Sequence, residues 1–222
     1  MKPKVLVIGD SHAQVFNLRS LKYFFGNYDY LVEWVGGATV SGLENPNSHT
    51  KTLAKLQRRI KNYKPDFIIC LFGEVDCGFV IWHRAKRHGE SIKRMFNQAV
   101  ERYGRFLLEL KNKSFVIVLS TPLPTLADYR DFPGKYDNSR NDIKVSQRKR
   151  TSLTLFFNRK IQEFCECHGI KYISLDKECL GDNGLVKEEL INNQETDYHY
   201  FRRLYAKIII DKFMEVFNEQ RN

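Results

Sequence analysis

The sequence predicts an α/β fold in which a mostly parallel sheet of about five strands carries helices on both sides. Two observations lead to this prediction. Short runs rich in apolar and β-branched residues recur along the chain, and amphipathic helical patterns fill most of the intervals between them. Strands that are buried on both faces read as continuous apolar runs, and their alternation with helices is typical of a parallel sheet with right-handed crossovers.

Each predicted strand has the length of a buried strand and is followed by a turn or a helical pattern. The predicted strands cover residues 5–8, 30–35, 67–72, 115–119 and 171–175. Apolar residues at helical spacing then predict helices over residues 53–63, 92–110, 153–164 and 204–217. These apolar stripes are expected to face the core, and the carboxyl ends of the strands are expected to carry the functional loops.

The length and the loops predict a single domain over residues 1–222. A chain of 222 residues with 42% hydrophobic residues is long enough for one well-buried core and short for two. The exception to the regular alternation is the stretch 122–147, which contains Pro122, Pro124, Pro133 and Gly134. A connection of this length is typical of a substrate lid or of an inserted loop, and the sequence does not separate the two.

The composition excludes several classes of protein. No stretch approaches the roughly 18 apolar residues of a membrane span, and the first apolar run is too short for a signal peptide, which predicts a cytoplasmic location. The five cysteines are odd in number and scattered, so neither a disulfide framework nor a zinc site is expected. The net charge of +10 gathers in residues 84–94 and 139–150. Such runs are usually solvated surfaces. As a functional feature they would attract a polyanion, which could be nucleic acid, a membrane surface or an acidic polysaccharide, and the absence of a nucleic-acid-binding motif ranks nucleic acid below the others.

A serine directly follows the first predicted strand, in the stretch Gly9-Asp10-Ser11. Where a strand gives way to a helix, a nucleophile can be exposed beside free backbone N–H groups. The alternative interpretation is that Ser11 only caps the next helix. Near the other end of the chain, Asp197 and His199 precede the last helical pattern. The three residue types together are those of a nucleophile, a base and an orienting acid.

Four short motifs follow one another along the chain: Gly9-Asp10-Ser11-His12, Val35-Gly36-Gly37-Ala38-Thr39, Gly73-Glu74-Val75-Asp76 and Asp197-Tyr198-His199. In their order and spacing the chain resembles the SGNH hydrolases, the GDSL-type esterases and lipases. The resemblance implies a flavodoxin-like three-layer α/β/α sandwich. It implies that Ser11 is the nucleophile, His199 the general base and Asp197 the acid, with the N–H groups of Ser11 and Gly37 in the oxyanion hole. This chemistry needs no metal and no cofactor.

The third motif departs from the family pattern. The family usually has an asparagine, whose side chain donates to the oxyanion, at the position of Val75. Valine has no donor, so another group replaces it, the hole consists of backbone N–H groups alone, or hydrolytic activity has been lost. Glu74 only accepts hydrogen bonds when ionised and would repel an oxyanion, so its predicted role is structural or substrate-positioning. Asp76 is predicted to stabilise the turn or to contact the substrate.

The neighbours of the serine and of the histidine depart from the pattern as well. Asp197 precedes His199 by two positions where the family usually has three, and Glu195 is the alternative acid. His12 stands where the family commonly has leucine. We expect its side chain to point away from Ser11, at the start of a helix or in the wall of the substrate pocket.

The sequence therefore favours a serine esterase that acts through an acyl-enzyme and removes a small acyl group from a carbohydrate or another polar substrate. Acetyl is the favoured acyl group. One alternative is an O-acyltransferase that uses the same Ser11 and His199 on a saccharide. Another is a non-catalytic glycan-binding module, which Val75 motivates. A histidine base also predicts activity that falls as the pH drops through its pKa.

Overall fold

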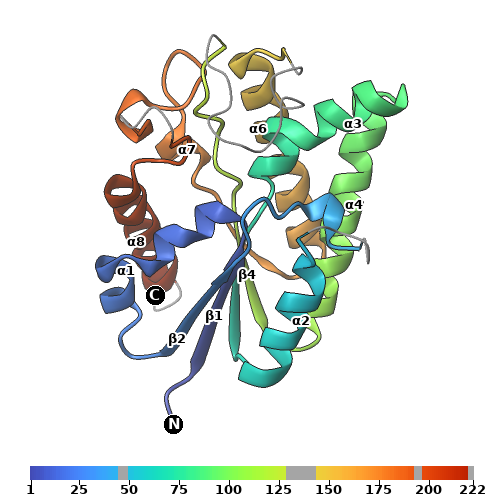
Figure 1. The fold of residues 1–222 in the computed structure, drawn as a ribbon. Coiled ribbons are helices and arrows are strands. Elements are labelled where there is room, and N and C mark those ends of the chain that lie inside the picture. Colours follow the sequence, from blue (N-terminus) through green and yellow to red (C-terminus); the bar gives the residue numbers. More distant parts are fainter. Residues whose placement is uncertain (45–49, 129–143, 193–196, 220–222) are drawn as a thin grey trace.

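The computed structural model describes residues 1–44, 50–128, 144–192 and 197–219 of the chain, with side chains up to residue 216. A five-stranded sheet lies at its centre, with every pair of neighbouring strands parallel (Figure 1). The order is β2-β1-β3-β4-β5. The strands are β1 (Lys4–Gly9), β2 (Asp29–Trp34), β3 (Phe67–Leu71), β4 (Phe115–Leu119) and β5 (Lys171–Ile173). The predicted α/β fold with a parallel five-stranded sheet is confirmed.

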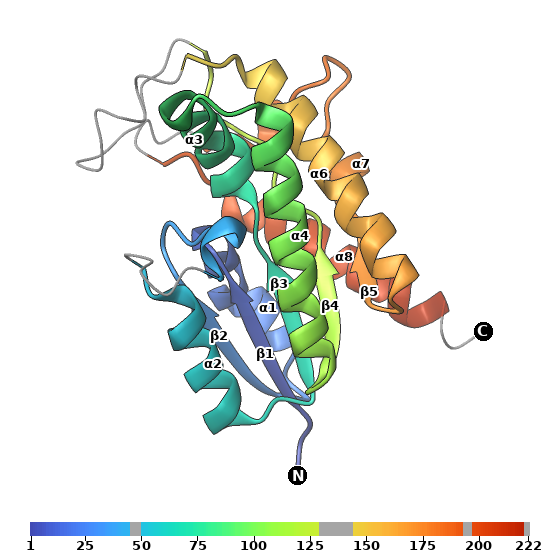
Figure 2. The same ribbon diagram turned by 90° about the vertical axis from the view of Figure 1, so that its right-hand side faces the viewer.

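Helices cover both faces of the sheet, as the turned view shows (Figure 2). One face carries α2 (Thr52–Tyr63), α3 (Ile81–His88), α4 (Ile92–Lys111) and α6 (Gln147–Cys167); the other carries α1 (Arg19–Phe24), α7 (Asp176–Cys179) and α8 (Arg202–Glu219). Successive side chains of a strand point to opposite faces of the sheet. In β1, Leu6 and Ile8 therefore pack in the core under α2, α3, α4 and α6, while Val5 and Val7 pack in the core under α1, α7 and α8.

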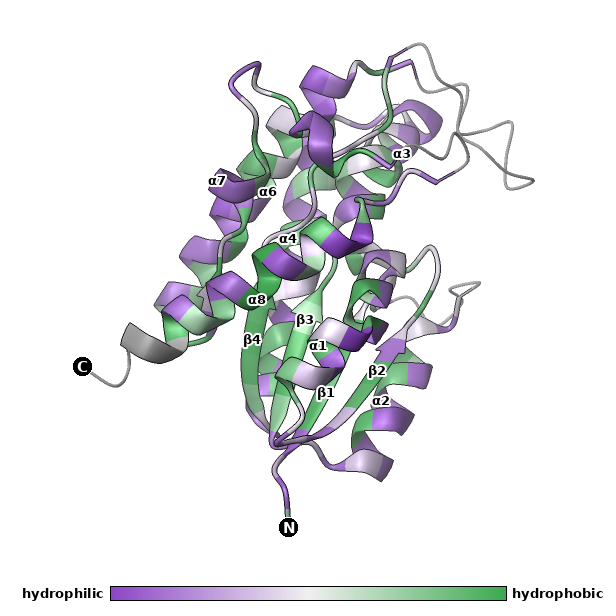
Figure 3. Ribbon diagram, turned by 90° about the vertical axis from the view of Figure 1, so that its left-hand side faces the viewer, coloured by the Kyte–Doolittle hydropathy of each residue, from purple (hydrophilic) through white to green (hydrophobic). Residues whose placement is uncertain are grey.

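Hydropathy follows this layering. Apolar residues gather on the strands and on the helix faces that meet them, and hydrophilic residues lie on the outward helix faces (Figure 3). Within the described ranges, the helices lack the combination of length and apolar character that crossing a bilayer requires.

The structure also differs from the predicted elements. It adds α1, α3 and α7, and α6 begins at Gln147, six residues before the predicted helix. Strand β5 ends at Ile173 because the backbone N–H of Leu175 donates to Ser120 Oγ at 2.8 Å, which takes the chain out of the sheet. Most of the predicted loop or lid at 122–147, namely residues 129–143, lies outside the described residues.

The strand order places a topological switch next to β1. The chain runs from β1 to β2 on one side and then crosses to β3 on the other side of β1. In open parallel sheets, ligands bind at the carboxyl ends of the strands beside such a reversal. Here that position is the end of β1, where Gly9 leads into Asp10 and Ser11.

Gly9 has no room for a side chain, and we expect Gly9→Ala to destabilise the fold. A Cβ atom at this position would overlap the carbonyl oxygen of Leu71 and lie 2.6 Å from Ala13 Cβ. The expected loss in the free energy of unfolding is about 3 kcal/mol, at the upper end for an overpacked core, and urea denaturation measures it. Gly36→Ala is the matched control, because its Cβ would meet only the Trp34 ring, at 3.6 Å. Equal stability of the two variants would contradict this account.

Candidate active site

Ser11 lies at the carboxyl edge of the sheet, directly after β1. Asp10 caps a 3₁₀ helix over Ser11–Asn17, and its Oδ1 accepts the backbone N–H of His12 at 2.9 Å. A short polar side chain at this position satisfies an N–H that the first helical turn leaves free, which favours starting the helix at Ser11. Ser11 has 8% of its surface exposed, so its hydroxyl lies at the boundary of the core.

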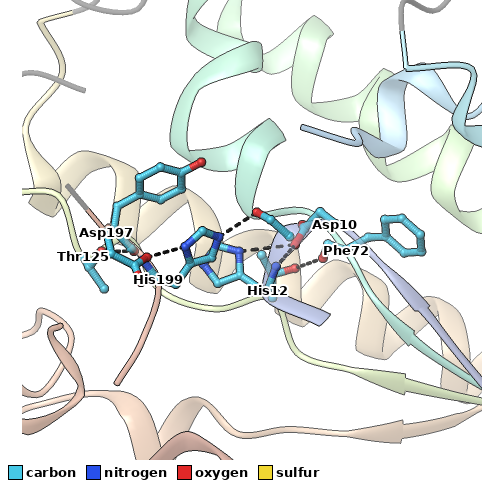
Figure 4. A network of polar contacts seen from close by, with 9 residues as sticks. Asp10, His12, Phe72, Thr125, Asp197 and His199 are labelled. Carbon is cyan, nitrogen blue, oxygen red and sulfur yellow. Dashed lines mark hydrogen bonds and ion pairs between the residues drawn. The ribbon is translucent and has the colours of Figure 1, made fainter. Parts of the chain in front are cut away.

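His199 contacts Ser11 from a position 188 residues further along the chain. Its Nε2 lies 2.8 Å from Ser11 Oγ, and its Nδ1 lies 2.5 Å from Oδ1 of Asp197 (Figure 4). The same oxygen of Asp197 accepts the backbone N–H of His199 at 3.0 Å. The structure thus brings the serine, the histidine and the acid into one hydrogen-bonded row, although the acid precedes the histidine by only two positions.

Contacts on both sides of His199 hold the loop that carries it. Tyr200 is buried, and its hydroxyl accepts the backbone N–H of Leu123 at 2.6 Å. The hydroxyl of Thr125 donates to the carbonyl oxygen of Tyr198. The two residues that flank His199 are therefore attached to the segment that follows β4, which fixes the imidazole before α8 begins.

Burial and neighbouring charges set the protonation states of the row. Burial lowers the pKa of His199 and the nearby His12 lowers it further, against the opposing attraction of Asp197. For Asp197, burial acts to raise the pKa, but the hydrogen bonds from His199 outweigh it and the pKa lies below its ordinary value. A neutral imidazole beside an ionised carboxylate is the state in which a histidine can accept the proton of a serine.

The loop after β2 carries Gly37 at the same edge of the sheet. Gly37 has a left-handed backbone with φ of 68°, and the N–H of Val35 donates to the carbonyl oxygen of Gly9 at 3.0 Å, which joins this loop to the end of β1. Within the described part of the chain, no hydrogen bond uses the backbone N–H of Ser11 or of Gly37. Free N–H groups on two neighbouring turns are suitable donors for an oxyanion.

The third motif forms the turn after β3. Gly73 has φ of 111°, and a Cβ there would lie 2.6 Å from Thr121 Oγ1, so the turn requires glycine. Asp76 is fully buried and accepts the backbone N–H groups of Val40 at 2.7 Å and Ser41 at 3.2 Å. Burial raises the pKa of Asp76 to about 6. Asp76 thus joins this turn to the loop after β2. The substrate contact predicted for Asp76 stays a prediction, and such a contact would require these two hydrogen bonds to break.

The two other residues of the motif lie in the same turn. Val75 is buried, and its side chain offers no hydrogen-bond donor. Glu74 is half-buried, and its negative charge acts on His12 and on Arg150. The substrate-positioning role of Glu74 stays a prediction.

His12 lies where the sequence did not lead us to expect it. Its ring was expected to point away from Ser11, at a helix start or in the pocket wall, and its centroid lies 4.6 Å from that of His199, the residue that contacts Ser11. With 5% of its surface exposed, His12 has little area to offer a substrate, although the sequence allowed it a place in the pocket wall. A signal was present in the sequence, because an aspartate precedes a histidine by two positions both at Asp10 and at Asp197.

Two further expectations concern groups outside this row. Glu195, the alternative acid, lies outside the described residues. Among the residues that the structure describes, no group of three or more histidine, cysteine and carboxylate side chains is placed to hold a metal ion.

The strand order β2-β1-β3-β4-β5 is that of flavodoxin-like sandwiches. At the end of β1 a serine contacts a histidine, which in turn contacts an acid, and this is the order of contacts in which serine hydrolases use these residue types. The chain shares its fold with solved structures of a GDSL-like lipase and of acetylxylan esterases.

Three of the similar structures are a lipase and two esterases by name. A GDSL-like lipase from Bacteroides thetaiotaomicron superposes with a TM-score of 0.62 at 17% identity, covering 99% of this chain and 89% of its own. An acetyl xylan esterase gives 0.57 at 16% identity, covering 96% and 98%. An acetylxylan esterase from Geobacillus stearothermophilus gives 0.54 at 14%, covering 97% and 95%. No protein-family model and no curated protein sequence matches the chain.

Proposed function

We propose that the protein is a serine-dependent esterase that removes a small acyl group, acetyl before others, from a carbohydrate or another polar substrate. The observation that carries this proposal is the row in which Ser11 Oγ lies 2.8 Å from His199 Nε2 and Asp197 Oδ1 lies 2.5 Å from Nδ1. A serine hydroxyl is a poor nucleophile until a base takes its proton, and the row supplies both the base and the acid that orients it.

The reaction follows from the positions of these groups. Ser11 Oγ attacks the carbonyl carbon of the ester while His199 Nε2 takes the hydroxyl proton, and Asp197 stabilises the imidazolium. The N–H groups of Ser11 and Gly37 receive the oxyanion, where one such donor typically contributes about 3 kcal/mol. The C–O bond then breaks, and the leaving alcohol takes the proton from His199. Water, deprotonated by His199, finally attacks the acyl-serine, which releases the carboxylic acid and restores the hydroxyl.

The choice of substrate rests on the relatives and on charge. Two of the similar structures are acetylxylan esterases by name, which supports an acetyl group on a carbohydrate. The net charge of +10 supports acidic polysaccharides among the substrates, because a basic surface attracts polyanions. An O-acyltransferase would pass the same acyl group from the serine to a sugar hydroxyl in place of water, and a non-catalytic glycan-binding module would carry out neither step.

Ester hydrolysis tests the proposal. We expect the highest kcat/KM with p-nitrophenyl acetate, lower values with the butyrate and octanoate esters, and release of acetate from acetylated xylooligosaccharides. Because the pKa of His199 lies below its ordinary 6.5, kcat/KM should decline only below about pH 6.5. Transfer of acetyl to an added sugar in preference to water would identify an acyltransferase. Absence of turnover with every ester and of transfer to every sugar would contradict an acyl-transfer function and favour the binding module.

A further inference from the structure

The site contains a second histidine–aspartate pair beside the first. Oδ1 of Asp10 accepts the backbone N–H of His12 at 2.9 Å and lies 3.3 Å from its Nδ1. Oδ1 of Asp197 makes the same two contacts with His199, at 3.0 and 2.5 Å. In both cases the aspartate precedes the histidine by two positions and fixes the ring through Nδ1. The two pairs meet because they flank Ser11 from the two ends of the chain.

The second pair is buried where the first is partly open. The side chain of Asp10 is completely buried and that of His12 is 3% exposed, whereas the His199 side chain is 16% exposed. The rings of His12 and His199 lie 4.6 Å apart between centroids, at 51° to each other. Figure 4 shows His12 lying between Asp10 and His199. With so little of its surface exposed, the His12 ring has more contact with His199 than it could have with a molecule in the pocket.

The surroundings of His12 favour its positive charge. Burial alone lowers the pKa of His12, but the hydrogen bond to Asp10 and the negative charges of Glu74, Asp10 and Asp197 outweigh burial, so the pKa is raised. Oδ2 of Asp10 is buried and has no hydrogen-bond partner in the described part of the chain. A buried carboxylate without a full set of hydrogen bonds is stabilised by a cationic partner that offsets its desolvation. For Asp10 this partner is the ring of His12, whose Nδ1 lies 3.3 Å from Oδ1.

The groups that face His12 come from three parts of the fold. Asp10 precedes it on the turn after β1, Glu74 acts from the turn after β3, and Asp197 and His199 belong to the loop before α8. Two tyrosine rings of that loop, Tyr198 and Tyr200, lie farther away, each 6.5 Å between centroids. Three carboxylates, those of Asp10, Glu74 and Asp197, therefore act to raise the pKa of His12.

We propose that His12, held as a cation by Asp10, is a positioning residue for the reaction: its charge and its ring keep His199 in the neutral, oriented form that accepts the proton of Ser11. A positive charge against the His199 ring disfavours a second positive charge there, and it accordingly lowers the pKa of His199. The inference rests on the proposed esterase function. According to this inference, the Asp10–His12 pair determines how far the pH can fall before the enzyme loses activity.

The test removes the charge of His12 and follows His199 itself. In His12→Gln, we expect the pKa of His199, measured by NMR of ¹⁵N-labelled histidine, to rise by about one unit, at the lower end of the effect of a close charge. The acidic limb of kcat/KM should move to higher pH by the same amount. His168→Gln is the matched control, since His168 stacks on Phe164 at the end of α6, away from the site, and its loss should leave both quantities unchanged.

A double variant guards against a loss of folding. Asp10→Asn combined with His12→Gln removes both buried charges, and asparagine remains a good helix cap. Because Asp10 raises the pKa of His199 less than His12 lowers it, the double variant should still show an upward shift, smaller than that of His12→Gln alone.

The outcomes separate this inference from the proposed function. An unchanged pKa of His199 in folded His12→Gln and in the double variant would overturn the inference, as would a loss of activity that is equal at all pH values. If the wild-type protein hydrolyses no ester, the proposed function fails. The NMR titration then still decides whether His12 controls the charge of His199.

Discussion

Replacing Ser11 with alanine should reduce kcat for ester hydrolysis by a factor on the order of 10⁶, the size found when the nucleophile of a serine hydrolase is removed. The acyl-enzyme cannot form without Oγ, and His199 then has no hydroxyl proton to take. Among the described residues the hydroxyl of Ser11 has a hydrogen bond only with His199, so the variant should fold normally. Hydrolysis of p-nitrophenyl acetate measures the loss.

Covalent labelling gives a second and independent measurement of the same prediction. A fluorophosphonate reacts with an activated serine, so intact mass spectrometry should show one adduct on the wild-type protein and none on Ser11→Ala. Ser152→Ala is the matched control, because Ser152 is exposed and donates only to the carbonyl oxygen of Arg148 on its own helix. An adduct that persists in Ser11→Ala, or activity that survives there, would place the nucleophile elsewhere.

Asp197→Asn should lower kcat by a factor on the order of 10⁴, as expected when an orienting acid is replaced by an amide. The carboxylate accepts from Nδ1 of His199 and so leaves Nε2 free to take a proton. An amide nitrogen facing Nδ1 would reverse this tautomer, and Nε2 would then carry the proton that blocks the reaction. Steady-state kinetics with p-nitrophenyl acetate measures the loss, and circular dichroism checks the fold.

The control for this variant is another aspartate of the same region. Asp211 pairs with Lys207 on the exposed side of α8, and Asp211→Asn should leave kcat unchanged. Activity of Asp197→Asn within about tenfold of the wild type would instead assign the orienting role to another carboxylate. Glu195 would then be the next residue to replace, since it is the alternative acid in the sequence analysis.

The sheet could be predicted from the sequence because its strands are buried on both faces. Such strands are continuous apolar runs, and their alternation with helices predicts a parallel sheet with right-handed crossovers. The helix α3 could not be found in this way, since its eight residues include only three apolar ones, Ile81, Trp82 and Ala85, within a basic stretch. The 3₁₀ helix after β1 also lacks helical periodicity, and the side chain of Asp10 starts it instead.

The site shows a similar division. The sequence pointed to Ser11, Asp197 and His199 because each lies at the end of a predicted strand or just before a predicted helix, where functional loops are expected. The structure places the three in contact. The repeated spacing of an aspartate two positions before a histidine indicates two similar pairs, but it does not predict that the rings of His12 and His199 meet. Neighbours in a regular helix diverge, whereas His12 lies in a 3₁₀ turn that Asp10 caps, and its ring meets that of His199.

The separation of 188 residues between Ser11 and His199 has a consequence for how the protein reaches its working form. Contacts between distant parts of a chain close late in folding, because the loop entropy is lost before the contact stabilises anything. The histidine also depends on Leu123 and Thr125, so the segment after β4 must be in place before the C-terminal loop can dock on it. A ribosome that has released only the first half of the chain has made the serine without its base. Recovery of activity during refolding therefore reports the last step of assembly, whereas the recovery of helix and strand signals reports earlier ones.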